Sequence, residues 1–166
     1  MNNMTIVKLS ATVVFLLSIA FVARSQAQPT LTLQGVGGKA LALSSVDLAK
    51  LPQKTIKTTD HGTAATFEGV LLSDVLHKVG LPTGEEFHST AASYYMLVEA
   101  RDGYRAVFAW AELDPTFMDK DVYVVTKRDG HLLGETDGPF QLVAPGEKRG
   151  ARWVRQVTAL RILRAK

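Results

Sequence analysis

The stretch "GPFQLVAPGEKRGARWVRQV", residues 138–157, is the part of this sequence from which the fold can be worked out. It starts with an apolar run, Phe140 to Ala144, that is typical of a buried β-strand, and the run stops at Pro145-Gly146. Four cations then follow around one more glycine: Lys148, Arg149, Arg152 and Arg155. Either they hold an anion, or they form a solvated edge that keeps the last strand from pairing.

The positive charge is local to the C-terminal part of the chain. The whole sequence has 19 Lys and Arg against 16 Asp and Glu, yet residues 148–166 contain seven Lys or Arg and no acidic residue. Because the rest of the chain is mixed in sign, we expect no nucleic acid among the partners.

Residues 1–27 predict a secretory signal peptide that is cut after Ala27. Lys8 opens a short basic region, Ala11 to Ala23 is an apolar run, and Ser25-Gln26-Ala27 has the small-x-small cleavage pattern. The alternative is an uncleaved membrane anchor, but a spanning helix needs roughly 20 apolar residues, and this run is shorter. We therefore expect residues 28–166 to form one domain without a stable membrane anchor.

The sequence contains no cysteine, which excludes a disulfide framework, a lipid-modified cysteine and a thiolate ligand for a metal. No Arg-Arg pair precedes the apolar run, so we expect the general secretory route rather than the twin-arginine route. The predicted location is the periplasm or the outside of the cell.

Strand signals dominate residues 28–166. Hairpins are predicted where β-rich runs flank glycine turns at 35–38, 102–103 and 129–130, and further strands at 54–60, 140–144 and 157–163. Ser44 or Ser45 caps a short helix over 46–50, and "FEGVLLSDVLHKVGLP", residues 67–82, is the clearest helical unit. These signals predict a strand-dominated α+β domain with two or three short helices.

The order of these elements, and above all residues 138–163, resembles the molybdopterin-binding domain of the sulfite oxidase family. The resemblance covers roughly residues 31–163, and its most specific matches are Gly138, Pro139, Leu142, Val143, Pro145, Gly150, Arg152 and Val154. Arg155 stands where a lysine is usual in the family. The resemblance implies a sulfite-oxidase-like fold and molybdopterin as the cofactor.

The resemblance also implies a site. The loop at 145–155 would hold the phosphate of the pterin cofactor, with Arg152 and Arg155 as its cations and with backbone N–H groups brought close to the anion at Gly146 and Gly150. The other cations of the stretch, Lys148 and Arg149, are interpreted as solvated surface.

The sequence departs from the family at the metal. Family enzymes hold molybdenum through one cysteine, and that position falls here among Thr58, Thr59, Asp60 and His61. A thiolate is not interchangeable with oxygen or imidazole ligands. We expect Thr59, Asp60 and His61 to be either cleft residues or a plain polar loop, and the four histidines of the sequence lack a recognised metal-ligand spacing.

Three hypotheses about function follow. The first is an exported sulfite-oxidase-like domain that binds a small anionic or heterocyclic, pterin-like ligand, or an extracytoplasmic protein partner, without thiolate-ligated molybdenum. The second is a molybdenum-cofactor oxidoreductase in which another residue, above all Asp60 or His61, or solvent replaces the cysteine. The third is a non-catalytic structural or interaction module.

Overall fold

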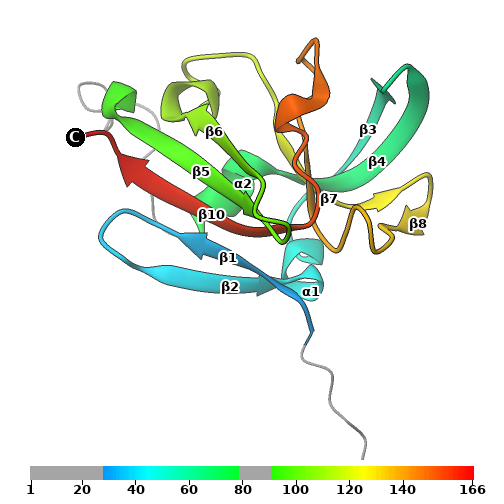
Figure 1. Ribbon diagram of the computed structural model, residues 1–166, viewed down its shortest axis with the longest axis horizontal. Helices are drawn as coiled ribbons and strands as arrows, with labels where there is room; N and C mark the ends of the chain where they lie inside the picture. Colours follow the sequence, from blue (N-terminus) through cyan, green and yellow to red (C-terminus); the bar gives the residue numbers. More distant parts are fainter. Residues whose placement is uncertain (1–27, 79–90) are drawn as a thin grey trace, which may run out of the picture.

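The computed structural model of the protein describes residues 28–78 and 91–166. The predicted signal peptide lies outside these residues, as does the expected end of the helical unit at Gly80 and Pro82. Two β-sheets and a few short helices build the domain, which confirms the strand-dominated α+β fold (Figure 1). Across the described ranges, no helix has the length and apolar character that a membrane span requires.

The first sheet has five strands in the order β2-β1-β10-β5-β6. β10 lies in the middle of this sheet, parallel to β1 and antiparallel to β5 (Figure 1). The interpretation of the nearby cations as protection for a free last strand is therefore wrong, because β10 is paired on both sides. The strands are β1 (Thr30–Gln34), β2 (Ala40–Ser44), β5 (Tyr94–Ala100), β6 (Arg105–Ala109) and β10 (Val157–Arg164).

The second sheet is built around β7, which pairs with β4, β8 and β9, while β3 pairs with the other side of β4. Its strands are β3 (Gln53–Asp60), β4 (Thr63–Leu71), β7 (Tyr123–Arg128), β8 (His131–Leu132) and β9 (Gln141–Val143). The three predicted hairpins are confirmed as the β1–β2, β5–β6 and β7–β8 pairs. Positive φ angles at Gly103 (86°) and Gly130 (81°) suit the glycine-containing turns of the last two.

One element differs from the prediction. Residues 67–71, expected in the helical unit, form the end of β4, and the helix α2 covers only Leu72–His77. The reason is tertiary: β4 lies between β3 and β7, and it buries Phe67 and Val70 in the core. Strand pairing outweighs the helical preference of a short apolar run.

The helices are short, as expected. Helix α1 (Ser45–Ala49) is capped by Ser44, whose hydroxyl accepts a hydrogen bond from the Asp47 backbone N–H at 3.2 Å. Residues 28–78 and 91–166 also contain three 3₁₀ turns: η2 (Ala91–Ser93), η3 (Trp110–Glu112) and η4 (Gly150–Arg152).

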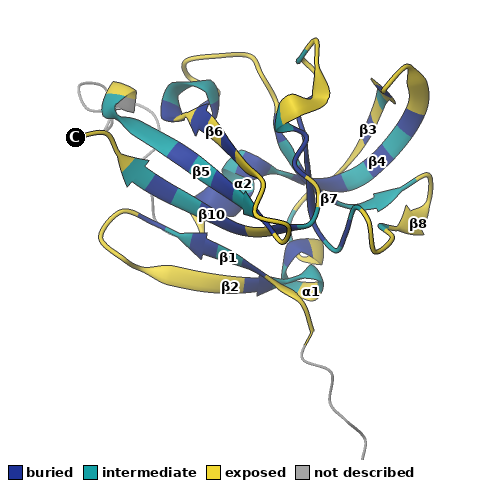
Figure 2. Ribbon diagram, in the orientation of Figure 1, coloured by how far each residue is buried: buried dark blue, intermediate teal, exposed yellow. Residues whose placement is uncertain are grey.

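One hydrophobic cluster joins the two sheets. It contains Leu31, Leu33 and Leu160 from the first sheet and Phe67 and Val124 from the second, all fully buried. Buried residues are concentrated in the middle of β4, β5, β7 and β10, whereas the projecting loops are exposed (Figure 2). The core therefore fixes the strands and leaves the loops at their ends free to form a site.

The close approach of β4 to β7 generates a prediction. A Cβ at Gly69 would lie 2.2 Å from the Val124 carbonyl oxygen, whereas a Cβ at Gly134 would meet nothing within 4 Å. We expect Gly69→Ala to lower the free energy of unfolding by about 3 kcal/mol, because the backbone of β7 must move. Urea unfolding measures this, with Gly134→Ala as the matched control that stays within about 0.5 kcal/mol. Equal stability of both variants would contradict the strand pairing.

Candidate functional site

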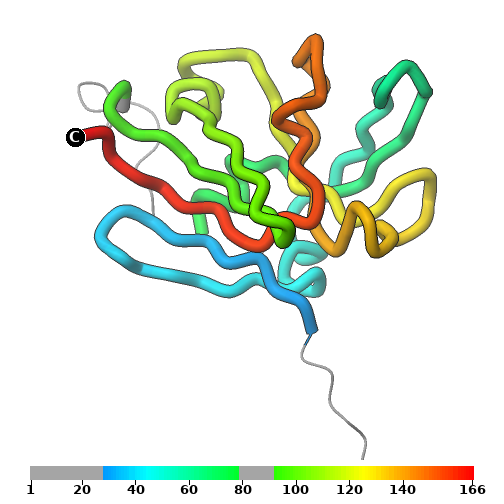
Figure 3. The backbone as a smooth tube through the Cα atoms, in the orientation of Figure 1, coloured from blue at the N-terminus to red at the C-terminus, as the bar shows by residue number. Residues whose placement is uncertain are grey.

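An open cleft of about 820 Å³ lies between the β3–β4 turn and the loop that leads into η4. Residues 58–62 line one side, and residues 145, 147–151 and 153 line the other. Both segments project from the same side of the molecule (Figure 3). The volume falls in the range of small-ligand sites, and the cleft brings together two segments that the sequence analysis singled out.

The β3–β4 turn has a strained backbone. His61 has φ of 47° and Gly62 has φ of 87°, so two consecutive residues adopt the left-handed region, as a tight hairpin turn of this kind requires. Asp129 and Gly130 adopt the same pair of positive φ angles in the β7–β8 turn, so this backbone conformation follows from the hairpin and is not specific to the cleft. His61 is exposed at the rim of the cleft, with 76% of its side chain accessible.

Asp60 is held beside this turn. Its side chain is only 8% exposed and accepts a hydrogen bond from the Arg128 guanidinium at 2.8 Å, while the second oxygen lies 3.8 Å from His61 Nε2. Arg128 also lies over the Phe67 ring, 5.3 Å from its centroid. Asp60 is thus a cleft residue whose charge is already paired.

Local hydrogen bonds shape the opposite wall. Trp153 packs edge-on against Phe67 with ring centroids 5.9 Å apart, and its indole N–H donates to the Ala144 carbonyl at 2.9 Å. The Tyr104 hydroxyl donates to the Ala151 carbonyl at 2.7 Å. Since Trp153 is buried in the core, residues between Ala144 and Trp153 are fixed at both ends.

Arg152 is not among the residues that line the cleft. Its guanidinium donates to both carboxylate oxygens of Glu112, at 2.8 and 3.0 Å, and forms an ion pair with Glu147. It also stacks on Phe108, 4.3 Å from the ring centroid. The hydrogen bonds from Arg152 hold the pKa of Glu112 below its ordinary value and in turn raise the pKa of Arg152, although partial burial opposes both shifts.

Two other predicted residues lie off the cleft. Arg155 pairs with Asp137 at 3.3 Å, and Gly146 lines a small neighbouring pocket beside Phe108 and Glu112. Gly150 does line the cleft. Phosphate binding by Arg152 and Arg155 stays a prediction, and in this structure both side chains have carboxylate partners.

The cations that do line the cleft are Lys148 and Arg149. Both side chains are exposed, and neither forms an ion pair with any carboxylate in residues 28–78 or 91–166. Their exposure agrees with the prediction of a solvated surface. That they line the cleft was not predicted, because the position of this loop opposite the β3–β4 turn depends on tertiary structure.

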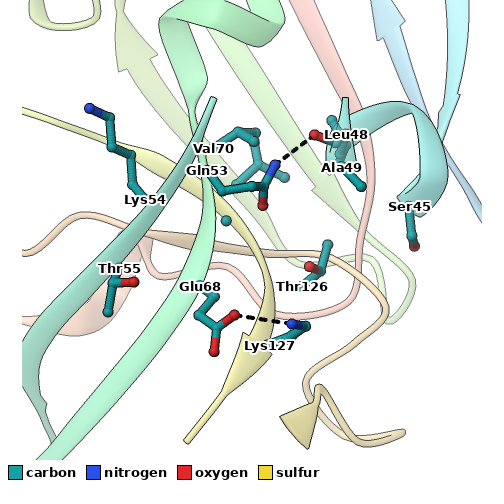
Figure 4. Close-up of a pocket in the computed structure, with 12 residues that line it drawn as sticks. Ser45, Leu48, Ala49, Gln53, Lys54, Thr55, Glu68, Val70, Thr126 and Lys127 are labelled. Carbon is teal, nitrogen blue, oxygen red and sulfur yellow. Dashed lines mark hydrogen bonds and ion pairs between the residues drawn. The ribbon is translucent and has the colours of Figure 1, made fainter. Parts of the chain in front are cut away.

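A second, smaller pocket of about 250 Å³ lies between α1 and the second sheet (Figure 4). Lys127 pairs with Glu68 there at 3.0 Å, and the Gln53 amide donates to the carbonyl of Leu48 at 2.9 Å (Figure 4). Gln53, Glu68 and Lys127 thus have partners, and among the described residues Lys54 is the cation of this pocket without an ion pair. The open cleft is larger and has two such cations, Lys148 and Arg149, so it is the better candidate.

The donor set of the cleft does not fit a thiolate-held metal, because the sequence contains no cysteine. Among the described residues no cluster of three or more His, Asp or Glu could hold a metal ion, and the Asp60 carboxylate is engaged by Arg128. Lys148 and Arg149 do fit the phosphate part of a pterin cofactor, since ammonium and guanidinium groups are typical phosphate ligands.

Comparison with known families agrees with this architecture. Residues 58–166 match the model of the oxidoreductase molybdopterin binding domain. This match covers more than half of the chain, and it includes both walls of the cleft. The protein therefore belongs to the molybdopterin-binding domain family of sulfite-oxidase-like oxidoreductases, as its resemblance predicts.

Among solved structures, the chain is similar to the sulfane dehydrogenase SoxCD from Paracoccus pantotrophus. The two are 21% identical with a TM-score of 0.61, and the match covers 81% of this chain but only 38% of that chain. The similarity therefore shows a shared fold, and this protein spans well under half of the longer one. The comparison with curated proteins gives no match.

The Glu112–Arg152 pair generates a prediction about acid stability. The pKa of Glu112 is lower in the folded chain than in the unfolded chain, so the pair stabilises fully above the unfolded value of about 4.3 and progressively less as pH falls through the folded value. We expect Glu112→Gln to cost about 1–2 kcal/mol at pH 7 and to flatten the loss of stability below pH 4.5. Urea unfolding between pH 7 and pH 3 measures both effects.

Glu135→Gln is the matched control, because the Glu135 side chain is exposed and forms no ion pair with a cation in residues 28–78 or 91–166. If the free energy of unfolding fell equally with pH in the wild type and in Glu112→Gln, the Glu112–Arg152 pair would not contribute to acid stability, and the prediction would be contradicted.

Proposed function

We propose that this protein is an exported domain that binds a small anionic, heterocyclic ligand of the pterin-phosphate type in the cleft between the β3–β4 turn and η4. The observation that carries the proposal is the pair Lys148 and Arg149, exposed in the cleft and without an ion pair to any described carboxylate. Membership of the molybdopterin-binding family supports the ligand class.

Each part of the cleft suits one part of such a ligand. Lys148 and Arg149 supply charge-assisted hydrogen bonds to a phosphate. Thr58, Thr59 and His61 offer hydroxyl and imidazole groups to the polar edge of a heterocycle. When bound, a molybdenum cofactor would supply redox chemistry, but this chain has no cysteine to hold its metal. Binding without thiolate-ligated molybdenum is the conclusion that this donor set favours.

An oxidoreductase that uses Asp60 as the metal ligand is less well supported, because the Asp60 carboxylate is buried and accepts from Arg128. A purely structural module would leave the exposed cations of the cleft without a role. A protein partner with an acidic segment would use the same two cations, so it is one outcome of the binding test.

The binding test removes both cations. We expect the double variant Lys148→Ala/Arg149→Ala to bind 6-hydroxymethylpterin phosphate at least about tenfold more weakly than the wild type, because two charge-assisted contacts are lost. Isothermal titration calorimetry measures this, with inorganic phosphate and unphosphorylated pterin as separate probes. The matched control is Lys39→Ala/Lys78→Ala, which removes two exposed lysines outside the cleft.

Unchanged affinity in the double variant would overturn the assignment of the cations. Absence of binding to all three probes by the wild type would overturn the ligand class and favour the protein partner or the structural module.

Export is tested separately. When the full chain is produced in a bacterial host, we expect the periplasmic product to begin at Gln28, because residues 25–27 have the cleavage pattern. Intact-mass measurement of the periplasmic fraction checks this, with Ala27→Lys as the control that blocks cleavage. A full-length, membrane-associated product from the wild type would favour the uncleaved anchor.

A further inference from the structure

Two carboxylates line the cleft that is proposed to bind an anion. Asp60 lies on the β3–β4 side and Glu147 on the opposite side. A free carboxylate within several ångströms of a bound phosphate would repel it and would offset much of the attraction from Lys148 and Arg149. The two walls therefore carry opposing charges unless something neutralises the carboxylates.

Each of them is paired with an arginine that lies outside the cleft lining. Arg128 donates to Asp60 at 2.8 Å, and Arg152 forms an ion pair with Glu147. Neither arginine is among the residues that line the cleft. Asp60 is 8% exposed and Glu147 is 15% exposed, so both pairs are largely shielded from solvent and from salt.

A second carboxylate orients each arginine. Arg152 is also held by Glu112, at 2.8 and 3.0 Å, and Arg128 lies 3.5 Å from Asp129. Each guanidinium also stacks on an aromatic ring, Arg152 on Phe108 and Arg128 on Phe67. These outer contacts fix each guanidinium where it pairs with the cleft carboxylate, and neither Glu112 nor Asp129 lines the cleft.

Among the residues that line the cleft, the charged side chains outside these pairs are Lys148 and Arg149. The second carboxylate of each group, Glu112 or Asp129, leaves that group with one net negative charge, and it lies outside the cleft lining. We propose that Arg152 and Arg128 are positioning residues for anion binding: they hold Glu147 and Asp60 in ion pairs and so weaken the repulsion of these two carboxylates toward an anion beside Lys148 and Arg149. This inference rests on the proposed function and gives Arg152 a role other than direct contact with phosphate.

A double-mutant cycle on the mature protein tests the inference for Arg152. The variants are Arg152→Met, Glu147→Gln and the double variant, and the probe is 6-hydroxymethylpterin phosphate in calorimetry. We expect Arg152→Met to weaken binding about three- to tenfold, because the Glu147 charge is released into the cleft. Glu147→Gln alone should change affinity less than about twofold, and the double variant should recover most of the loss.

Two readouts separate this role from a structural one. The loss in Arg152→Met should shrink when the salt concentration is raised from 50 to 300 mM, because the Debye length falls from about 14 Å to about 6 Å, whereas a loss caused by misfolding would persist. The thermal midpoint of each variant shows whether Arg152→Met is folded. The Asp60→Asn variant is the parallel case for Arg128, and we expect less than about a twofold change in affinity.

The inference is overturned if Arg152→Met weakens binding equally with and without Glu147→Gln. If Arg152→Met does not fold, the Glu147→Gln variant alone tests the inference. An affinity gain of about tenfold in this variant would show that Glu147 repels the ligand despite its pair with Arg152, and would overturn the inference. Absence of binding by the wild type is a different result, since it contradicts the proposed function.

Discussion

The position of β10 between β1 and β5 is the constraint on which the rest of the structure depends. β10 joins the N-terminal hairpin to the β5–β6 hairpin, and its buried residues, such as Leu160 and Ile162, belong to the common core. The loop before β10 must therefore start at β9, in the second sheet, and end in the first sheet. A loop that crosses between two sheets is held at both ends, so it can present side chains in a defined way.

The geometry of the candidate site follows from the way this loop runs from one sheet to the other. Trp153 anchors the loop in the core, and the Glu112–Arg152–Glu147 group fastens it to η3. Across the cleft, the β3–β4 turn is fixed by the Arg128–Asp60 pair. Two half-buried arginines, Arg128 and Arg152, thus fix these segments and pair with the carboxylates of the cleft, while Lys148 and Arg149 are exposed.

Local signals made most of the fold predictable. Asp-Gly turns with positive φ mark the hairpins at Gly103 and Gly130, and Ser44 marks the start of α1. The strand β4 was not predictable in the same way, because its identity depends on the close contact of Gly69 with the backbone of β7. That contact joins residues about fifty-five positions apart and leaves no local pattern in the sequence.

For the candidate site, the two chain segments could be predicted from the sequence, but the individual side chains could not. Both the turn at Asp60 and His61 and the loop after Pro145 were identified from sequence and family resemblance, and they line one cleft. Which cations line the cleft could not be predicted, because the 3₁₀ turn at Gly150–Arg152 and the distant partner Glu112 decide where Arg152 lies. Sequence spacing does not report a partner forty residues away.

The central claim is that the cleft, rather than the second pocket, is the ligand site. Backbone amide chemical shifts of the isotope-labelled mature protein, followed during titration with 6-hydroxymethylpterin phosphate, test it most directly. The account predicts shifts concentrated at His61, Gly62 and residues 148–151, which line the cleft. Shifts concentrated at Lys54, Glu68 and Lys127, which line the second pocket, would contradict it, as would a titration that leaves every amide unchanged.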